Sequence, residues 1–385
     1  MAKTIVIMLD AFRKDYFSEE NTPFMFGLTK KYGLGRLQEP FGFKTAVGFF
    51  TGLKPKSLNQ FTYYGYNGKV NKFPFNLLLK FLPGKLKFYF INLFNFMIGN
   101  EMFLPPISIN YFKYFDTIQK KHFYKKRSVP AETIFDIFRR KKVKYLFYDF
   151  PLIIKNDKSG LHCTLKNNDE TRVKKFIKLM KKDYGFYYLH LSDIDAVGHH
   201  LGTNSKEISK SLKKEDNLVK KILSSFDLEK DNVLLWSDHG MVEVKNKFDL
   251  KSNLPKFGEG YIYFLDSTMA RFWFFDEKKK KEVLSILKKE KRGRILSDKE
   301  KKRLGIDFKN NFYGDEIFLL NSGNIISPCF FHKEDLKGMH GYDLADKNEL
   351  AIFITNRFFK KNAKTEDLFE ATVNMVGLKT TKDKK

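Results

Sequence analysis

The stretch VLLWSDHGM, residues 233–241, is the most specific part of this sequence. Its first four residues have the length and apolar character of a buried strand. Asp238 and His239 follow at the end of that run, and Gly240 permits the chain to turn there so that both side chains reach one ion. Burying such a pair without a ligand or a partner is costly. The stretch therefore predicts a buried strand that ends in a metal-binding pair.

Short apolar runs of the same kind alternate along the chain with stretches of helical spacing. The predicted strands are residues 4–9, 144–148, 186–191, 233–236, 316–320 and 350–354. The predicted helices are residues 169–182, 205–225, 277–289 and 366–376. Strands separated by helices form a mainly parallel sheet with helices on both faces, so we expect an α/β fold. In such sheets, binding sites form at the carboxyl ends of the strands.

Two segments interrupt this alternation. Residues 54–130 are aromatic, basic and irregular, and residues 245–334 have their own predicted strands around 262–265 and 271–275. We expect both to be insertions that cap the edge of the sheet where the site lies. The catalytic α/β core would then comprise the remaining ranges, which are residues 1–53, 131–244 and 335–385.

Composition excludes several classes of protein. Of 385 residues, 42% are apolar and 16% aromatic, which is enough for a sizeable core and excludes wholesale disorder. The two cysteines, Cys163 and Cys329, exclude a disulfide scaffold and a CxxC zinc ribbon and favour a reducing compartment. No targeting segment is visible, and the longest uncharged stretch of the most apolar region, residues 88–100, is too short to span a bilayer. We therefore expect a cytoplasmic protein, with peripheral membrane contact as a variant.

The chain is strongly basic. It contains 71 Lys and Arg against 45 Asp and Glu, a formal net charge of +26. A field of that sign attracts phosphates, nucleic acid or an anionic membrane surface. However, an AT-rich coding sequence would raise Lys and Phe together, and the chain has 42 Phe. A Lys-rich surface can also be simply solvated, so the charge alone does not identify a partner.

Three further segments carry candidate metal ligands. In residues 190–202, HLSDIDAVGHHLG, one helical turn would bring Asp195 and His199 to the same side, where they can share a divalent ion; the alternative is a polar loop with a capping Asp. Asp10 ends the apolar run 4–9, although an Asp in that position also caps helices and turns. His340 lies near two glycines in a predicted loop, and gains weight only beside the other candidates.

A candidate nucleophile lies in residues 43–53, FKTAVGFFTGL. The stretch after Thr45 can begin a helix, and a hydroxyl at a helix N-terminus lies where backbone N–H groups favour anions, including a bound phosphate. The alternative is an ordinary N-cap threonine.

Taken together and in this order, these segments resemble the alkaline phosphatase superfamily, and within it the type I phosphodiesterase and nucleotide pyrophosphatase group. The resemblance extends over most of the chain. The matching residues are Asp10, Lys44, Thr45, the TGL of residues 51–53, Asp195, His199, the SDHGM of residues 237–241, His340 and Gly341. The sequence argues against a sulfatase, because that family needs Cys or Ser in a C/S-x-P-x-R pattern and the candidate nucleophile here lies in Lys-Thr-Ala-Val-Gly.

The resemblance implies two divalent metal ions, usually Zn²⁺ in that family, with Mn²⁺ or another divalent ion as the alternative. By the resemblance, one ion is held by Asp195, His199 and His340. The other ion is held by Asp10, Thr45, Asp238 and His239. Thr45 would be the nucleophile and would form a phosphothreonine intermediate. Metal coordination is the physical means of activating this hydroxyl, which is a poor nucleophile at neutral pH.

The chain departs from the family pattern downstream of Thr45. In the phosphodiesterase branch an Asn there helps to hold a phosphate oxygen, but the spacing here is shorter and no Asn aligns. Asn67 is the predicted substitute for this substrate-binding role. Lys44 is a second predicted substrate-binding residue, although it can equally be an exposed surface lysine. Arg271 can reach a phosphate or form a structural ion pair.

The sequence therefore predicts a two-metal phosphoester hydrolase acting on diesters or pyrophosphates, with a nucleotide among the candidate substrates. The alternatives are a phosphomonoesterase or a phosphoryl-group transferase acting on a sugar- or lipid-linked substrate. An alternative of another class is a non-catalytic basic protein that binds nucleic acid or a membrane. Aromatic and lysine residues between 73 and 96 can stack on a base, dock on an anionic bilayer or pack the core of the cap.

Overall fold

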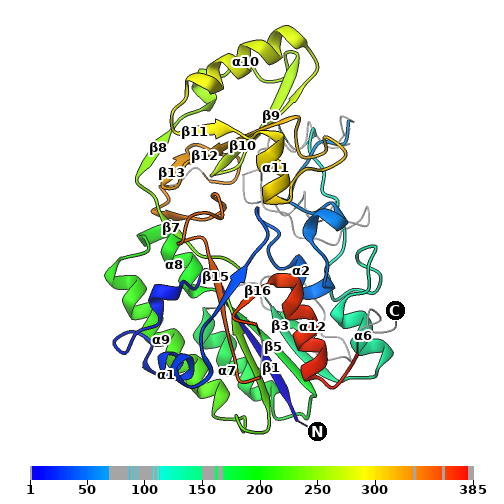
Figure 1. The fold of residues 1–385 in the computed structure, drawn as a ribbon, viewed down its shortest axis with the longest axis vertical. Coiled ribbons are helices and arrows are strands. Elements are labelled where there is room, and N and C mark those ends of the chain that lie inside the picture. The colour runs from blue at the N-terminus through cyan, green and yellow to red at the C-terminus, as the bar shows by residue number, and fades with distance from the viewer. Residues whose placement is uncertain are drawn as a thin grey trace.

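The computed structural model describes residues 2–68, 113–149, 161–163, 168–332, 335–357 and 360–379, together with residues 86, 90, 93, 107 and 111. A large α/β body lies below a smaller part rich in β-structure (Figure 1). The aromatic residues between 73 and 96, for which base stacking, membrane docking or packing of the cap was predicted, lie almost entirely outside the described residues. None of the described helices is both long and apolar enough to cross a membrane.

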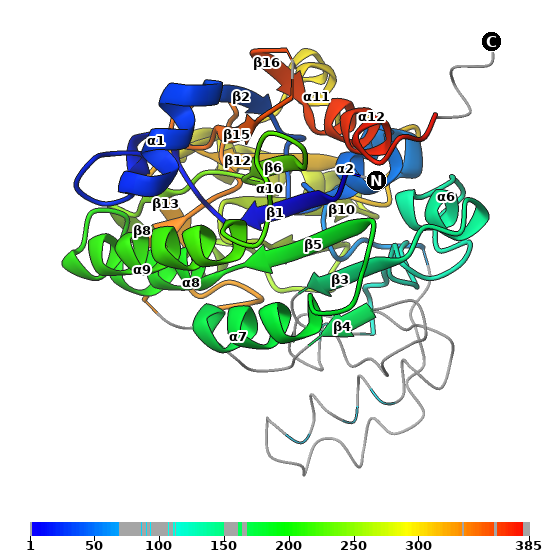
Figure 2. The same cartoon turned by 90° about the horizontal axis from the view of Figure 1, so that it is seen from below.

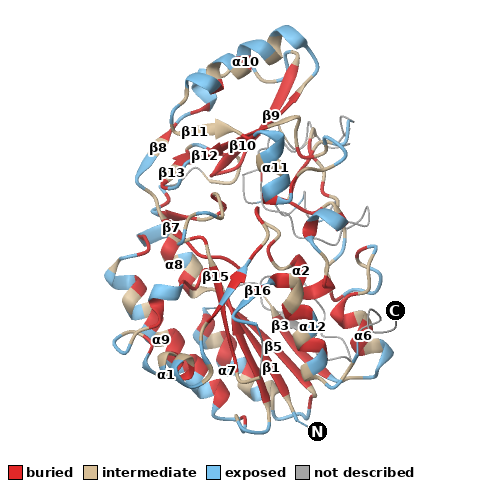
Figure 3. Cartoon of the chain, viewed as in Figure 1, coloured by how far each residue is buried: buried red, intermediate tan, exposed pale blue. Residues whose placement is uncertain are grey.

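An eight-stranded sheet forms the centre of the large body. Its strand order is β16-β2-β15-β6-β1-β5-β3-β4. In that order, the strands are Asn362–Lys364, Gly35–Gln38, Ala351–Thr355, Asn232–Trp236, Thr4–Leu9, Phe186–Leu191, Tyr145–Asp149 and Leu161–Cys163. Each residue of β1, β5 and β6 is buried, as Figure 3 shows for the middle of the sheet, which is why these strands are continuous apolar runs.

The sheet is mainly parallel, as the sequence predicted. β1 pairs in parallel with β5 and β6, and β3 pairs in parallel with β5 and β4. β15 is the exception, because it runs antiparallel to both β2 and β6. The parallel register puts the carboxyl ends of β1, β5 and β6 at one edge of the sheet, which is where the site is expected.

Helices cover both faces of this sheet (Figure 2). On one face, apolar residues of β1 pack with helices α1, α7, α8 and α9, which are Pro23–Tyr32, Asp169–Leu179, Asp193–Leu201 and Lys206–Leu223. On the other face, they pack with helices α2, α6 and α12, which are Val47–Thr51, Ile134–Arg140 and Thr365–Met375. The predicted α/β fold with helices on both faces is therefore confirmed. The described residues also include three short 3-10 helices, Lys14–Tyr16, Pro55–Leu58 and Lys251–Asn253.

The smaller part is built on an antiparallel sheet of order β11-β12-β10-β9. These strands are Gly293–Ile295, Glu316–Leu320, Met269–Phe274 and Tyr261–Leu265, and helices α10 and α11 are Glu277–Lys289 and Asp298–Leu304. All six elements lie within residues 245–334, the range predicted as the second insertion. The strand predicted at 316–320 and the helix at 277–289 therefore exist, but they belong to this smaller part and not to the central alternation.

Two short strand pairs lie where the chain passes between the two parts. β8 (Asn246–Phe248) pairs with β13 (Asn324–Ile326), and β7 (Val242–Glu243) pairs with β14 (Gly338–Met339). The β7–β14 pair joins the chain that follows the Asp-His pair of residues 238–239 to the chain that precedes His340. Residues more than 90 positions apart are thus brought to one place.

Candidate active site

A cavity of about 620 Å³ lies at the carboxyl edge of the central sheet. Three of the acidic residues that line it come shortly after the ends of strands. Asp10 directly follows β1, Asp238 follows β6, and Asp195 lies on α8, which follows β5. The residues that line it are Met8, Asp10, Phe43, Lys44, Thr45, Ala46, Val47, Tyr63, Phe123, Asp149, His190, Asp195, His199, Asp238, His239, Ser267, Phe331, His332, Met339 and His340. All seven predicted metal-binding residues, including the candidate nucleophile Thr45, therefore face one cavity.

The predicted ligand set of Asp10, Thr45, Asp238 and His239 is closely packed around the ring of His239. Its Nε2 lies 3.3 Å from Oδ1 of Asp10 and 3.5 Å from Oδ2 of Asp238. The Thr45 hydroxyl donates to Oδ2 of Asp238 over 3.2 Å and is itself buried. The helix expected after Thr45 begins two residues later, at Val47, so Thr45 precedes α2 and does not cap it.

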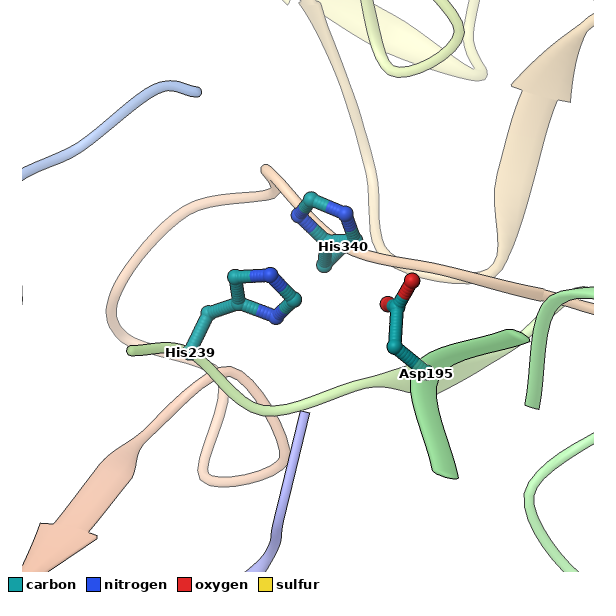
Figure 4. A group of neighbouring side chains, drawn as sticks. All are labelled: Asp195, His239 and His340. Carbon is teal, nitrogen blue, oxygen red and sulfur yellow. The ribbon is translucent and has the colours of Figure 1, made fainter. Parts of the chain in front are cut away.

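In the other predicted set, Asp195, His199 and His340, the side chains of Asp195 and His199 are more exposed than those of Asp238 and His239. Nε2 of His199 lies 3.2 Å from Oδ1 of Asp195, one turn away on α8, and its Nδ1 faces the carbonyl oxygen of Gly338 at 2.9 Å. The rings of His239 and His340 stack with their centroids 3.7 Å apart. Asp195, His239 and His340 point toward one another (Figure 4).

Two groups of these side chains have the geometry to hold an ion. Ligand atoms of Asp10, Asp238 and His239 lie within 4.8 Å of one another, and so do those of Asp195, His239 and His340. His239 belongs to both groups and lies between them. Among the described residues, His199 is in neither compact group, although it directly contacts Asp195.

The donor atoms fit divalent cations. Oδ1 of Asp10, Oδ1 of Asp238 and Nδ1 of His340 are buried and have no hydrogen-bond partner among the described residues. Buried polar atoms are normally paired, and leaving them unpaired is costly. Carboxylate oxygens and imidazole nitrogens at this spacing are the ligands that Zn²⁺ and similar ions prefer.

The electrostatics of the cavity also favour a bound cation. Burial and the neighbouring charge of Asp10 raise the pKa of Asp238 to about 7. Burial alone would lower the pKa of His239, but Asp238 and Asp10 outweigh it and raise that pKa to about 10. Burial and the adjacent His239 push the pKa of His340 well below its usual value. Four aspartates line the cavity, and their carboxylates repel one another, so a bound cation relieves that repulsion.

His190 is a site residue to which the sequence assigned no role. It lies in β5, and its two ring nitrogens are 2.9 Å from Oδ2 of Asp10 and 2.7 Å from Oδ1 of Asp149. The signal that points to it is a polar residue near the carboxyl end of an otherwise apolar strand. These two carboxylates outweigh burial and raise the pKa of His190 to about 10.

The two predicted substrate-binding residues lie in different places. Lys44 lines the cavity, with Nζ 4.5 Å from the centroid of the Tyr63 ring, and burial lowers its pKa to about 8. Asn67 is exposed and not among the lining residues; its amide donates to Asp116 over 3.4 Å. The chain at Gly65 pairs with Asp116, which directs Asn67 to the surface. This position does not fit the substrate-binding role predicted for Asn67.

Arg271 is part of the structure of the smaller sheet. It is fully buried, with Nε 2.8 Å from Asp266 and Nη1 donating to the carbonyl oxygen of Tyr64 over 2.7 Å. Of the two predicted roles for Arg271, the structural ion pair is therefore the one that the structure shows.

Solved structures with the same fold include human ectonucleotide pyrophosphatase/phosphodiesterase 5 (ENPP5). It matches with a TM-score of 0.67 and 18% identity over 98% of this chain and 96% of that chain. The murine protein in an inactive variant with a threonine replaced by alanine, in complex with AMP, matches with a TM-score of 0.66 and 18% identity over the same shares. At this identity the likeness shows the fold.

One curated relative matches over a shorter range. It is the 2,3-bisphosphoglycerate-independent phosphoglycerate mutase of Pyrococcus abyssi (strain GE5 / Orsay), 32% identical over 80 residues. The match covers 20% of this chain and 19% of the relative's length.

The family model for type I phosphodiesterase / nucleotide pyrophosphatase matches residues 4–343, most of the chain. The resemblance found in the sequence is confirmed, and the chain belongs to the type I phosphodiesterase / nucleotide pyrophosphatase family.

Proposed function

We propose that this protein is a metal-dependent phosphodiester hydrolase with Thr45 as its nucleophile. The observation that carries this proposal is the convergence of Thr45 with six aspartate and histidine side chains in one cavity. Together these seven residues come from five separate segments of the chain. Family membership supports the reaction class. The inactive threonine variant of murine ENPP5 supports the choice of residue type.

The site would hold two divalent ions. Asp10, Thr45, Asp238 and His239 would hold one, and Asp195, His199 and His340 the other, with the ring of His239 between them. When bound, the ions supply positive charge beside the nucleophile and the leaving oxygen. Zn²⁺ suits this mixture of carboxylate and imidazole ligands, and Mn²⁺ is an alternative.

Thr45 would attack phosphorus directly. Its hydroxyl lies 3.2 Å from Asp238, so this carboxylate orients the oxygen and is within reach of its proton. A bond forms from Oγ1 to phosphorus while the bond to the leaving alcohol or phosphate breaks. From a diester, the resulting phosphothreonine keeps the second ester group. Water then attacks its phosphorus, the bond between Oγ1 and phosphorus breaks, the phosphate monoester leaves, and Oγ1 regains its proton.

A nucleotide is the proposed substrate class. Aromatic residues of the cavity wall, Phe43, Tyr63, Phe123 and Phe331, offer apolar surface for a base, and the Lys44 ammonium group offers a charge for phosphate. Murine ENPP5, which shares the fold, was solved with AMP. Because burial lowers the pKa of Lys44 to about 8, a phosphate bound nearby would favour its charged form.

Replacement of Thr45 tests the covalent mechanism. We expect Thr45→Ala to lower turnover of a chromogenic phosphodiester by about 10³-fold or more, because the attacking oxygen is lost. Thr45→Ser is the matched control: it keeps the hydroxyl and should retain measurable turnover. Both variants should keep the thermal stability of the parent protein. A Thr45→Ala variant with unchanged turnover would contradict the mechanism.

The choice of substrates in the same assay separates the alternatives. The proposal predicts faster hydrolysis of the diester than of the matching monoester. Preference for the monoester would favour a phosphomonoesterase, and release of product only with an added alcohol acceptor would favour a transferase. Salt-sensitive binding of nucleic acid without any hydrolysis would favour a non-catalytic binding protein.

A further inference from the structure

Three neighbouring strands of the central sheet place polar side chains side by side. β1, β5 and β3 are adjacent, and the register pairs Met8 with His190 and Tyr148 with Leu189. Asp10 and Asp149 therefore flank His190 at the carboxyl edge of the sheet. All three residues line the candidate active site.

The imidazole of His190 bridges the two carboxylates. Its Nε2 lies 2.9 Å from Oδ2 of Asp10, and its Nδ1 lies 2.7 Å from Oδ1 of Asp149. Both are hydrogen-bond distances, and only 7% of the surface of His190 is exposed. Contacts at both nitrogens fix the plane and the position of the ring, so the imidazole is a rigid support for Asp10.

The two oxygens of Asp10 consequently have different surroundings. Oδ2 is engaged by His190, whereas Oδ1 lies 3.3 Å from Nε2 of His239 and has no hydrogen-bond partner among the described residues. Oδ1 is the oxygen that faces Asp238 and His239, the other side chains of this ligand group. The carboxylate is thus oriented before any ion binds.

We propose that His190, anchored by Asp149, is a positioning residue that engages Oδ2 of Asp10 and leaves Oδ1 as the single oxygen offered to the ion. This inference rests on the proposed two-metal function. Hydrogen bonds from an outer shell of residues orient metal ligands, and removing them costs about 10- to 100-fold in metal affinity or activity. His190 would orient the ligand Asp10 and would not bind the ion itself, because both of its ring nitrogens face carboxylate oxygens.

Two amide substitutions at residue 190 separate the two hydrogen bonds. The amide nitrogen of Gln extends to the place of Nε2 of His, and that of Asn to the place of Nδ1. His190→Gln therefore keeps a donor for Asp10 and loses the contact with Asp149. His190→Asn keeps a donor for Asp149 and loses the contact with Asp10. The two variants are uncharged and of similar polarity, so each is the control for the other.

The main readout is Zn²⁺ affinity, measured on metal-free full-length protein by competition with a chromophoric chelator. We expect His190→Asn, which loses the donor to Asp10, to weaken binding of one Zn²⁺ by about 10- to 100-fold. His190→Gln keeps that donor and loses only the anchor at Asp149, so it should weaken binding by less than about tenfold. Because the defect is in metal loading, excess Zn²⁺ should restore the turnover of His190→Asn toward that of the parent, with the KM for the diester nearly unchanged. A role confined to folding would not give this rescue.

Residue 149 provides a second pair of variants if His190→Asn fails to fold. Asp149→Asn keeps an oxygen that accepts from Nδ1, and Asp149→Ala removes it. We expect Asp149→Ala to weaken Zn²⁺ binding and Asp149→Asn to stay close to the parent protein. Thermal unfolding of the metal-free variants should be similar within each pair.

Equal Zn²⁺ affinity of the two members of both pairs would overturn the inference, whether the affinities are lowered or unchanged. This outcome leaves the proposed function intact as long as the parent protein binds two ions and requires Thr45. A parent protein that binds no ion contradicts the proposed function itself, and the inference with it.

Discussion

Gly240 shows how closely single residues constrain the site. Its N–H donates to the carbonyl oxygen of Glu349 over 2.8 Å, and a Cβ at this position would lie 1.9 Å from the carbonyl oxygen of Asn348. The backbone that follows His239 can therefore pack against residues 348–349 only if it has no side chain here. The ring of His239 is fixed in the same place, because its Nδ1 lies 2.8 Å from the carbonyl oxygen of Gly240.

We expect Gly240→Ala to destabilise the protein by about 1–3 kcal/mol or more, because the added methyl group meets rigid backbone. Gly27→Ala is the matched control. Gly27 is exposed on α1, and nothing lies within 4 Å of a Cβ there, so this change should stabilise the protein by about 0.5–1 kcal/mol. Denaturant unfolding of both variants measures the difference. A Gly240→Ala protein as stable as the parent would show that this close approach is absent.

Which site residues were predictable depends on their sequence context. Asp10 and Asp238 stand at the ends of apolar runs, so their position at the sheet edge follows from the sequence. The marker of His190, a polar residue inside an apolar strand, does not reveal its role, because its partners Asp10 and Asp149 are 180 and 41 positions away in the chain. Asn67 was assigned by residue type alone, and the pairing of Gly65 with Asp116 that directs it outward cannot be inferred from local sequence.

Among the elements, the buried strands were the most predictable. β1, β5 and β6 are continuous apolar runs because neighbours cover both of their faces. β2 and β16 were not predicted. They are four and three residues long, alternate buried with exposed residues, and lie toward one edge of the sheet. Their place in the sheet depends on pairing with distant segments, which a short polar run does not indicate.

The start of helix α8 is held by a buried charged cluster. Oδ2 of Asp169 accepts from the N–H groups of Ser192 and Asp193 over 2.7 and 2.6 Å, and Oδ1 lies 3.2 Å from Arg172. Asp169 and Arg172 are fully buried. Since α8 carries the candidate ligands at 195 and 199, this cluster fixes the position of part of the site.

We expect Asp169→Ala to destabilise the protein by about 3–5 kcal/mol, because it leaves the buried Arg172 charge without this carboxylate. Glu170→Ala is the control. Glu170 is the next residue on α7, but its ion pair with Lys174 is exposed and should contribute little to stability. Thermal and denaturant unfolding give both values. Equal stability of the two variants would contradict the assigned role of Asp169.

In the whole molecule, an ion-pair cluster ties the smaller part to the chain around the site. Asp343, three residues after His340, lies 2.6 Å from Arg294 of β11 and 2.6 Å from Arg303 of α11. The Arg303 hydrogen bond, followed by the N–H of Ala345 and then the Arg294 hydrogen bond, outweighs burial and lowers the pKa of Asp343 to about 2. A carboxyl group whose pKa is lowered on folding adds stability above its unfolded pKa, and this stability is lost as the pH falls toward the folded value.

Asp343→Asn should therefore cost up to about 2 kcal/mol of stability at pH 7. Its difference from the parent protein should shrink as the pH falls from about 4 to about 2, where Asp343 itself becomes protonated. Asp335→Asn is the control, since Asp335 is exposed and pairs with Lys247 alone among the ion pairs of the described residues. Urea unfolding at a series of pH values measures both differences. A difference for Asp343→Asn that stays constant over this range would contradict the assignment.

The central claim is that segments far apart in the chain hold two cations beside Thr45. Anomalous X-ray diffraction from crystals grown with Zn²⁺ tests it most directly. We expect two anomalous peaks in the cavity, about 3.5–4 Å apart, one within bonding distance of Asp10 and Asp238 and the other within bonding distance of Asp195 and His340. A cavity without a peak, or Zn²⁺ bound only elsewhere on the molecule, would contradict it.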